Sequence, residues 1–384
     1  MASDKTDILI FVEDPGAANI VVDLPATLAG RGLAALTVAA GHALSYLGSL
    51  EGSFVAAAPS ETAASLIDAH APRLILAGTS ENRDTLGLRL IEEARRRGIP
   101  SIGVVDMPTS AEYRFRGRGE TPLAFAPDWL LVPDDITLRR FVDLGMAENR
   151  VVDCGHPYFD RMRDAGRALA TQGRAAVRAR ALPNAPSDRP VLVFLAEISD
   201  GLVPGAFERG DDYTLSGRGG SNLRTRIVLE EVLDAIALLQ PRPYVVLRLH
   251  PKNTEREFAA YRREIDHLSR GGLPHETMFA ADLVVGMTTA SLFEAALMGC
   301  PTLSVIPRPV EFKWLTGIAL GIIPSVHTRE ALRETLAGAV ADPTRLMGMP
   351  ADKVIHFGAL DRMADFLEDR LAADARRSKA GGED

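Results

Sequence analysis

The sequence has few cysteines, no excess of positive charge and no long apolar run. Its 384 residues include only two cysteines, Cys154 and Cys300, which excludes a disulfide framework and fits a reducing cytoplasm. A net charge of −8 argues against a general nucleic-acid binder. No stretch approaches the ~18 apolar residues that cross a bilayer, and the apolar run Ile8–Val12 is too short for a signal peptide. We therefore expect a cytoplasmic protein without a metal site.

Short apolar runs alternate with helical patterns in both halves of the chain. This alternation is typical of parallel sheets covered by helices on both faces. A segment with three prolines, residues 182–190, separates the halves, and the pattern restarts at Val191–Leu195. The sequence predicts an α/β fold with two doubly wound, Rossmann-like domains, residues 1–182 and 183–352, followed by a helix over residues 353–371. Further helices are expected over residues 19–29, 85–97, 134–144, 164–180, 222–239, 254–269 and 328–341.

Residues 281–305 form the most informative segment. A short apolar strand leads through Gly286 to the hydroxyl-bearing residues Thr288, Thr289 and Ser291, and a helix carrying Glu294 follows. Such a turn offers backbone N–H groups and the positive end of a helix dipole to an anion. A carboxylate on an otherwise apolar helix needs a partner, and the hydroxyls of a sugar next to a bound phosphate would supply one. The segment predicts a nucleotide-diphosphate pocket; the alternative is an N-capped helix without a ligand.

A second anion site is expected where another strand ends. Arg248, His250 and Lys252 alternate along the chain, so they would project to one side while the strand persists. Three cationic or donor groups on one side favour an anion, and the alternative is a solvated strand edge.

Several residues follow other strands and are predicted to contact a ligand or to close over it. Glu197 follows the first strand of the second half, and the Gly-rich loop 201–221 with Arg218 could clamp a phosphate. Arg308 and Lys313 follow the strand near residue 305. The alternatives are a mobile loop and ordinary surface charge.

The first half carries the acid–base candidates. Glu13 and Asp14 follow the first strand, without the spaced glycines of a dinucleotide fingerprint. Asp106 and His156 follow later strands, where parallel sheets bind ligands. A general base has to be a carboxylate or histidine within reach of the reacting group. Each also has a structural alternative: an ordinary turn with a helix cap for Glu13 and Asp14, a capping acid for Asp106, and a histidine hydrogen-bonded at a domain seam for His156.

Three motifs together resemble the GT-B superfamily, most closely UDP-N-acetylglucosamine 2-epimerases and capsule or CDP-glycerol-type transferases. They are GHPYFDRM (155–162), RLHPK (248–252) and TTASLFEAALMGCP (288–301). The resemblance implies two domains facing a central cleft and a last helix that crosses back to the first domain. It also implies that Thr288, Thr289 and Ala290 contact the diphosphate, that Glu294 binds the ribose, and that His250 lies near the base or phosphates.

Two departures from the epimerases favour a transferase. Thr-Thr-Ala replaces Ser-Gly-Gly at the turn, and Leu-Ala-Glu-Ile-Ser-Asp stands where the epimerases carry a His-Arg-x-Glu-Asn type element. We therefore expect a metal-independent glycosyltransferase for polysaccharide synthesis, with a nucleotide sugar such as a UDP-sugar as co-substrate, no cofactor, and a small-molecule or glycan acceptor. A homodimer is compatible with the sequence. The alternatives are a nucleotide-sugar 2-epimerase or hydrolase on the same fold, and a non-catalytic nucleotide-sugar-binding protein.

Overall fold

The computed structural model describes residues 6–49, 53–78, 80, 82–198, 207–272 and 274–380. The chain divides into two compact units. Residues 1–160 and 355–384 form the first unit, and residues 161–354 form the second. The first boundary therefore falls inside helix α8 (Pro157–Gln172), earlier in the chain than the proline-rich segment at residues 182–190.

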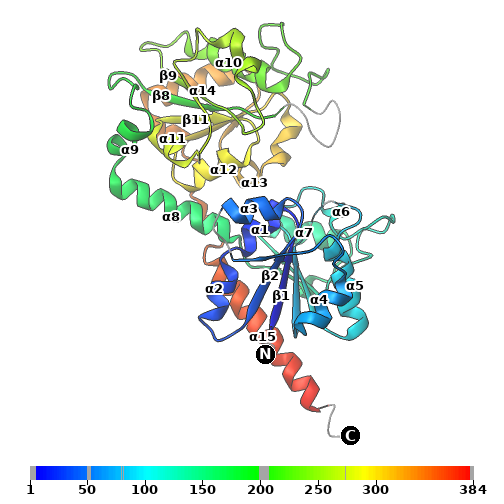
Figure 1. Cartoon of the computed structure of the whole chain (residues 1–384). Helices are drawn as coiled ribbons and strands as arrows, with labels where there is room; N and C mark the ends of the chain where they lie inside the picture. The colour runs from blue at the N-terminus through cyan, green and yellow to red at the C-terminus, as the bar shows by residue number, and fades with distance from the viewer. Residues whose placement is uncertain are drawn as a thin grey trace. The chain divides into compact units, whose positions relative to one another are not determined.

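The described part of the first unit contains a sheet of parallel strands in the order β3-β2-β1-β4-β5-β6-β7. Alternate side chains of β1 enter two different cores, because successive residues of a strand point to opposite faces. Helices accordingly cover both faces of the sheet (Figure 1). The strands are β1 (Ile8–Val12), β2 (Ala35–Ala39), β3 (Val55–Ala56), β4 (Leu74–Gly78), β5 (Ser101–Val104), β6 (Trp129–Val132) and β7 (Val151–Asp153). The helices are α1 (Pro15–Val21), α2 (Leu24–Ala29), α3 (Ala43–Ser49), α4 (Ala63–His70), α5 (Leu86–Arg97), α6 (Ala111–Arg114), α7 (Asp135–Asp143) and α15 (Ala359–Ala380).

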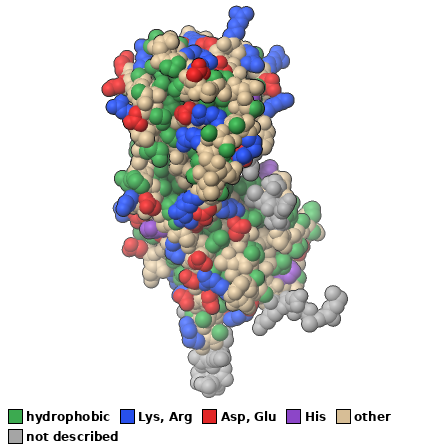
Figure 2. All heavy atoms as spheres, turned by 90° about the vertical axis from the view of Figure 1, so that its left-hand side faces the viewer, with side chains coloured by type: hydrophobic (Ala, Val, Ile, Leu, Met, Phe, Trp, Pro, Cys, Tyr) green, Lys and Arg blue, Asp and Glu red, His purple; other side chains and the backbone are tan. Residues whose placement is uncertain are grey.

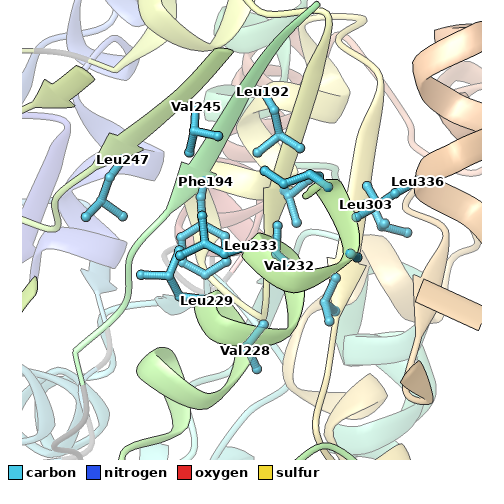
Figure 3. Packing of buried hydrophobic residues seen from close by; sticks show 14 of the residues in the cluster. Leu192, Phe194, Val228, Leu229, Val232, Leu233, Val245, Leu247, Leu303 and Leu336 are labelled. Atoms are coloured by element: carbon cyan, nitrogen blue, oxygen red, sulfur yellow. The ribbon is translucent and has the colours of Figure 1, made fainter. Parts of the chain in front are cut away.

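The described part of the second unit has its own parallel sheet, in the order β10-β9-β8-β11-β12-β13. Figure 3 shows Phe194 of β8 packed beside Leu229 and Leu233 of α10 in the core on one face of this sheet. The strands are β8 (Val191–Leu195), β9 (Tyr244–Arg248), β10 (His267–Ser269), β11 (Leu283–Gly286), β12 (Thr302–Val305) and β13 (Ser325–Val326). The α-helices besides α8 are α9 (Arg174–Ala181), α10 (Arg224–Ile236), α11 (His275–Ala280), α12 (Ala290–Leu297), α13 (Thr316–Ala319) and α14 (Arg329–Ala341).

Four expected helices differ from the structure. The last one, expected over residues 353–371, begins six residues later, at Ala359, and runs to Ala380. The helix over residues 19–29 is two helices, because Pro25 lies at the start of α2. The helix over residues 164–180 is likewise divided at Gly173, whose φ is +83°. The helix expected over residues 254–269 is wrong: the 3-10 helix η2 (Glu255–Tyr261) and the edge strand β10 occupy this segment.

The last helix, α15, packs on the first unit. Leu367 and Leu371 enter the core beneath β1, and Arg362 donates hydrogen bonds to the Cys154 carbonyl at 3.1 and 2.9 Å. In the described part of the chain, no helix combines the length and apolarity that a membrane crossing requires. Figure 2 shows basic and acidic side chains interspersed over the face in view.

Candidate functional site

The turn between β11 and α12 is occupied by a carboxylate of the protein itself. Glu197 follows β8, and its Oε1 accepts backbone N–H bonds from Met287 (3.2 Å), Thr288 (2.6 Å) and Thr289 (2.8 Å). The sequence predicts that these N–H groups are available for a phosphate, but in the structure they donate to Glu197. Thr289 also caps α12, since its hydroxyl accepts a bond from the N–H of Ser291 at 3.3 Å.

An arginine that the sequence analysis missed holds Glu197 in place. The guanidinium of Arg224 is completely buried and contacts Glu197 Oε2 at 2.7 Å, Glu311 Oε2 at 2.8 Å and Thr288 Oγ1 at 3.0 Å. Glu311 in turn accepts a bond from Arg308 at 2.7 Å. Arg308 therefore belongs to an internal ion-pair network, which we call the Glu197–Arg224 network. The three partners of Arg224 are far from it in sequence, so no local pattern reveals them.

Arg248 is a half-buried cation with neutral partners. It is the last residue of β9 and donates to Ser269 Oγ at 3.1 Å and to the Gly272 carbonyl at 2.5 Å. No carboxylate pairs with Arg248 among the described residues, and burial lowers the pKa of its guanidinium. A partly desolvated positive charge without an acid partner favours an anionic ligand.

His250 and Lys252 do not share a strand face with Arg248. Because β9 ends at Arg248, both residues lie in the following turn, where the N–H of Lys252 donates to His250 Nδ1 at 3.2 Å. This bond makes Nδ1 an acceptor, so a neutral His250 ring carries its proton on Nε2. The expected alternation therefore ends at Arg248, and Lys252 is exposed.

Glu294 has a histidine neighbour. His275, at the start of α11, places Nε2 3.6 Å from the Glu294 carboxylate, and both side chains are mostly buried. The contact is an ion pair when His275 is protonated. The sequence pattern indicates Glu294 but not His275, which lies 19 residues earlier on another helix.

A cavity of about 820 Å³ adjoins Arg248 and His275. Its charged lining is mostly basic, with His267 and Arg270 besides these two residues, and its acid Glu276 is paired with Arg180 at 2.8 Å. Burial and the charge of Arg262 lower the pKa of His267. The volume lies in the range of pockets that bind small ligands and cofactors.

Of the remaining residues of the second unit that are expected to contact a ligand, Arg218 forms ion pairs within the protein and Lys313 is exposed. Arg218 pairs with Asp234 and Glu264, each at 2.6 Å, so its charge anchors its own loop and is not left for a phosphate. Lys313 is exposed, with its ammonium 5.8 Å from the centre of the Phe312 ring. The beginning of the Gly-rich loop, residues 199–206, lies outside the described residues.

The acids of the first unit lie in three different environments. Asp106 pairs with Arg114 at 3.1 Å and packs against Gly16, where a Cβ would come within 2.0 Å of Asp106 Oδ2. Asp14 stands at the N-cap of α1 without a side-chain capping bond, so the cap alternative does not hold for it. Glu13 has a buried Oε2 without a hydrogen-bond partner. Burial and the neighbouring charge of Asp14 raise the pKa of Glu13.

His156 and the two cysteines are buried. His156 is buried, its ring stacks on Phe159 with centroids 4.6 Å apart, and its Nδ1 accepts a bond from the N–H of Tyr158. Burial raises the pKa of Cys154 and of Cys300 to about 12, so neither thiol is a reactive nucleophile at neutral pH. No group of acids, histidines and cysteines suited to a metal ion occurs among the described residues.

Comparison with solved structures identifies the architecture. UDP-GlcNAc 2-epimerase from Methanocaldococcus jannaschii aligns with a TM-score of 0.66 and 11% identity, over 94% of this chain and 99% of that one. MnaA from S. aureus, solved with UDP, aligns with a TM-score of 0.62 and 13% identity, over 96% and 97%. The wall teichoic acid polymerase TagF aligns with a TM-score of 0.50 and 13% identity, over 96% and 89%.

The chain has the GT-B fold. Its architecture is similar to that of the UDP-GlcNAc 2-epimerases, as the three sequence motifs indicated. No protein-family model matches the sequence, and neither does any curated protein. At identities of 11–13% the likeness concerns the fold alone, so the roles of individual residues in this GT-B protein stay predictions.

Proposed function

We propose that this GT-B protein is an enzyme acting on a nucleotide-diphosphate sugar whose nucleotide is held by the second unit. The observation that carries the proposal is Arg248, a half-buried guanidinium with neutral partners on the wall of a nucleoside-sized cavity. A phosphate would give this cation the anionic partner that none of the described residues supplies. The bound UDP named for MnaA is further support, because that protein has the same fold.

Residues of α12, which His275 of the cavity wall contacts through Glu294, fit the rest of such a ligand. Glu294 is a carboxylate that can accept bonds from ribose hydroxyls, with His275 beside it. Ser291 and Thr289 place hydroxyls at the start of α12, where the helix dipole favours a phosphate. This arrangement requires no metal ion, because arginine and helix-terminal donors neutralise the diphosphate.

Epimerisation and glycosyl transfer are the two candidate reactions. The solved structures of this fold include several UDP-GlcNAc 2-epimerases, which favours an epimerase as the first candidate. The Thr-Thr-Ala turn and the segment around Glu197 depart from the epimerase motifs, which favours the glycosyltransferase. An epimerase needs acid–base groups on both faces of the sugar, whereas a transferase needs a base for the acceptor hydroxyl. The acceptor, a homodimer and the cytoplasmic location stay predictions.

Incubation with UDP-GlcNAc and no acceptor separates the two reactions. An epimerase converts it to its 2-epimer, and a hydrolysing enzyme releases free UDP, both visible by proton NMR. An unchanged substrate that is consumed once an oligosaccharide acceptor is added supports the transferase. Tight binding without turnover under any of these conditions identifies a binding protein instead.

The nucleotide site is tested by binding. We expect the Arg248→Gln variant to bind UDP about 10- to 150-fold more weakly, because a hydrogen bond to a charged group contributes about 1.5–3 kcal/mol. Isothermal titration calorimetry measures the difference, after a thermal-shift screen of UDP, CDP, GDP, TDP, CMP and ADP has found the preferred nucleotide.

The exposed Arg256 on η2 supplies the matched control, since Arg256→Gln removes the same charge from the same unit. Its affinity should equal that of the wild type. If the wild type and both variants bind UDP with equal affinity, the nucleotide lies away from Arg248.

A further inference from the structure

The Glu197–Arg224 network has a feature that the proposed function does not use. Three successive backbone N–H groups converge on one oxygen of Glu197, with the shortest bond, from Thr288, at 2.6 Å. Successive N–H groups that point to one place form an anion-binding concavity. In this protein a side chain from the end of β8 fills that concavity.

Burial makes this arrangement dependent on Arg224. Glu197 is 8% exposed and Arg224 is 0% exposed. A buried carboxylate is tolerated only when its charge is paired and its oxygens are hydrogen-bonded. Arg224 supplies the charge to Glu197 Oε2, while the backbone of the turn satisfies Oε1. The same guanidinium bonds the Thr288 hydroxyl, so turn, carboxylate and arginine form one connected unit.

We propose that Glu197 and Arg224 are positioning residues that fix the β11–α12 turn in the conformation that receives the phosphate. With the N–H groups of Met287, Thr288 and Thr289 committed to Glu197, a phosphate at this turn is bound by the Ala290 N–H and the hydroxyls of Thr289 and Ser291. This rests on the proposed nucleotide site and adds the residues that shape it.

Amide hydrogen exchange of the nucleotide-free protein tests the positioning directly. In Glu197→Gln the neutral amide no longer pairs with Arg224, so we expect the amides of Met287–Thr289 to exchange at least tenfold faster. The amides of the neighbouring strands β8 and β11 should keep their protection. Unchanged exchange at the turn overturns the proposal, whether or not any nucleotide binds.

Affinity for UDP tests the consequence. We expect Glu197→Gln to bind UDP about tenfold more weakly than the wild type. A tighter complex would show that Glu197 competes with the phosphate for the turn. An unchanged affinity would show that the turn's order does not matter for binding. Either result overturns the proposal, whereas a wild type that binds none of the six nucleotides refutes the proposed function and leaves the exchange result to decide the positioning.

Glu231 provides a matched control. It is a buried carboxylate of the same unit that also accepts two loop N–H bonds, from Ser216 and Gly217, and pairs with an arginine, Arg329. Glu231→Gln should therefore lower stability and loosen its own loop without changing the affinity for UDP.

Thr288→Val is a milder second variant, which serves if Glu197→Gln does not fold. It removes the hydroxyl bonded to Arg224 and Glu197 while keeping the backbone N–H groups. The expected result is a smaller increase in exchange at the turn and a threefold weaker complex with UDP. Wild-type values for both measurements would contradict the positioning role.

Discussion

The carboxyl group of Glu13 lies at the end of β1, with one oxygen buried and without a hydrogen-bond partner. Burial and the charge of Asp14 raise its pKa, so the folded protein holds this proton more tightly than the unfolded chain does. Stability contributed by the protonated form is therefore lost as the pH rises from the ordinary value of a glutamate towards the raised pKa of Glu13. Groups with shifted pKa values in partly buried positions are typical of acid–base catalysts.

Glu13→Gln should separate stability from activity. The amide cannot ionise, so the variant should not show this loss of stability. At pH values above the raised pKa of Glu13, the variant should melt at a higher temperature than the wild type. At pH values below the ordinary pKa of a glutamate, the variant should have no such advantage. Turnover should fall by about 10²–10⁴-fold, the usual contribution of a general acid or base. Thermal melts across pH and steady-state rates measure both effects.

The exposed Glu148 of the same unit is the control, and Glu148→Gln should change neither stability nor rate. If Glu13→Gln keeps full turnover, the reaction uses another acid, with Asp14 and Asp106 as the remaining candidates.

The sequence could select those candidate site residues whose signal is local. Glu294 stands out as a lone acid on an apolar helix, and Arg248 as a charge at the end of an apolar strand. Arg224 and His275 could not be found in this way. Arg224 is recognised by its contacts with Glu197 and Glu311, which are 27 and 87 residues away. Such contacts follow from the packing of the sheet and not from any spacing along the chain.

At the level of elements, α8 packs closely against the end of α12. A Cβ at Gly166 would lie 2.4 Å from the Met298 carbonyl oxygen and 2.6 Å from its Cα. Because these are backbone atoms, a rotamer change cannot relieve the contact. In Gly166→Ala, overpacking should cost about 1–3 kcal/mol and exceed the gain of about 0.5–1 kcal/mol from alanine in a helix.

Urea unfolding measures this change, with Gly48→Ala as the matched variant. Gly48 lies in α3 and a Cβ there meets nothing within 4 Å, so this substitution should stabilise the protein slightly. If both Gly166→Ala and Gly48→Ala stabilise the protein, α8 can move away from α12 without loss of stability.

The elements that the sequence predicts well have a strong periodic signal. The buried strands of both sheets are nearly continuous apolar runs, and α5, α10 and α14 carry clear apolar stripes. The sequence predicts a helix where the edge strand β10 lies, because its three residues, His267–Ser269, are mostly polar and follow an amphipathic segment. An edge strand buries less of its surface, so its composition carries little information.

At the level of the whole molecule, each unit has its own sheet and its own buried core. Proteins with separate cores depart from two-state unfolding, since each core can melt by itself. A ligand stabilises only the folded form of the unit that binds it. The proposed nucleotide site lies within the second unit, so UDP should act on that unit's transition.

The two tryptophans allow this to be measured unit by unit. The chain has two tryptophans, of which Trp129 lies in the first unit and Trp314 in the second. In Trp129→Phe the fluorescence follows the unfolding of the second unit. UDP at a concentration of 100 times its dissociation constant should raise the melting temperature of this unit by about 5–10 °C, because such binding contributes about 2.7 kcal/mol. In Trp314→Phe the fluorescence follows the first unit, whose transition should shift much less. Equal shifts would show that the units melt as one cooperative body, and a shift confined to the first unit would place the nucleotide there.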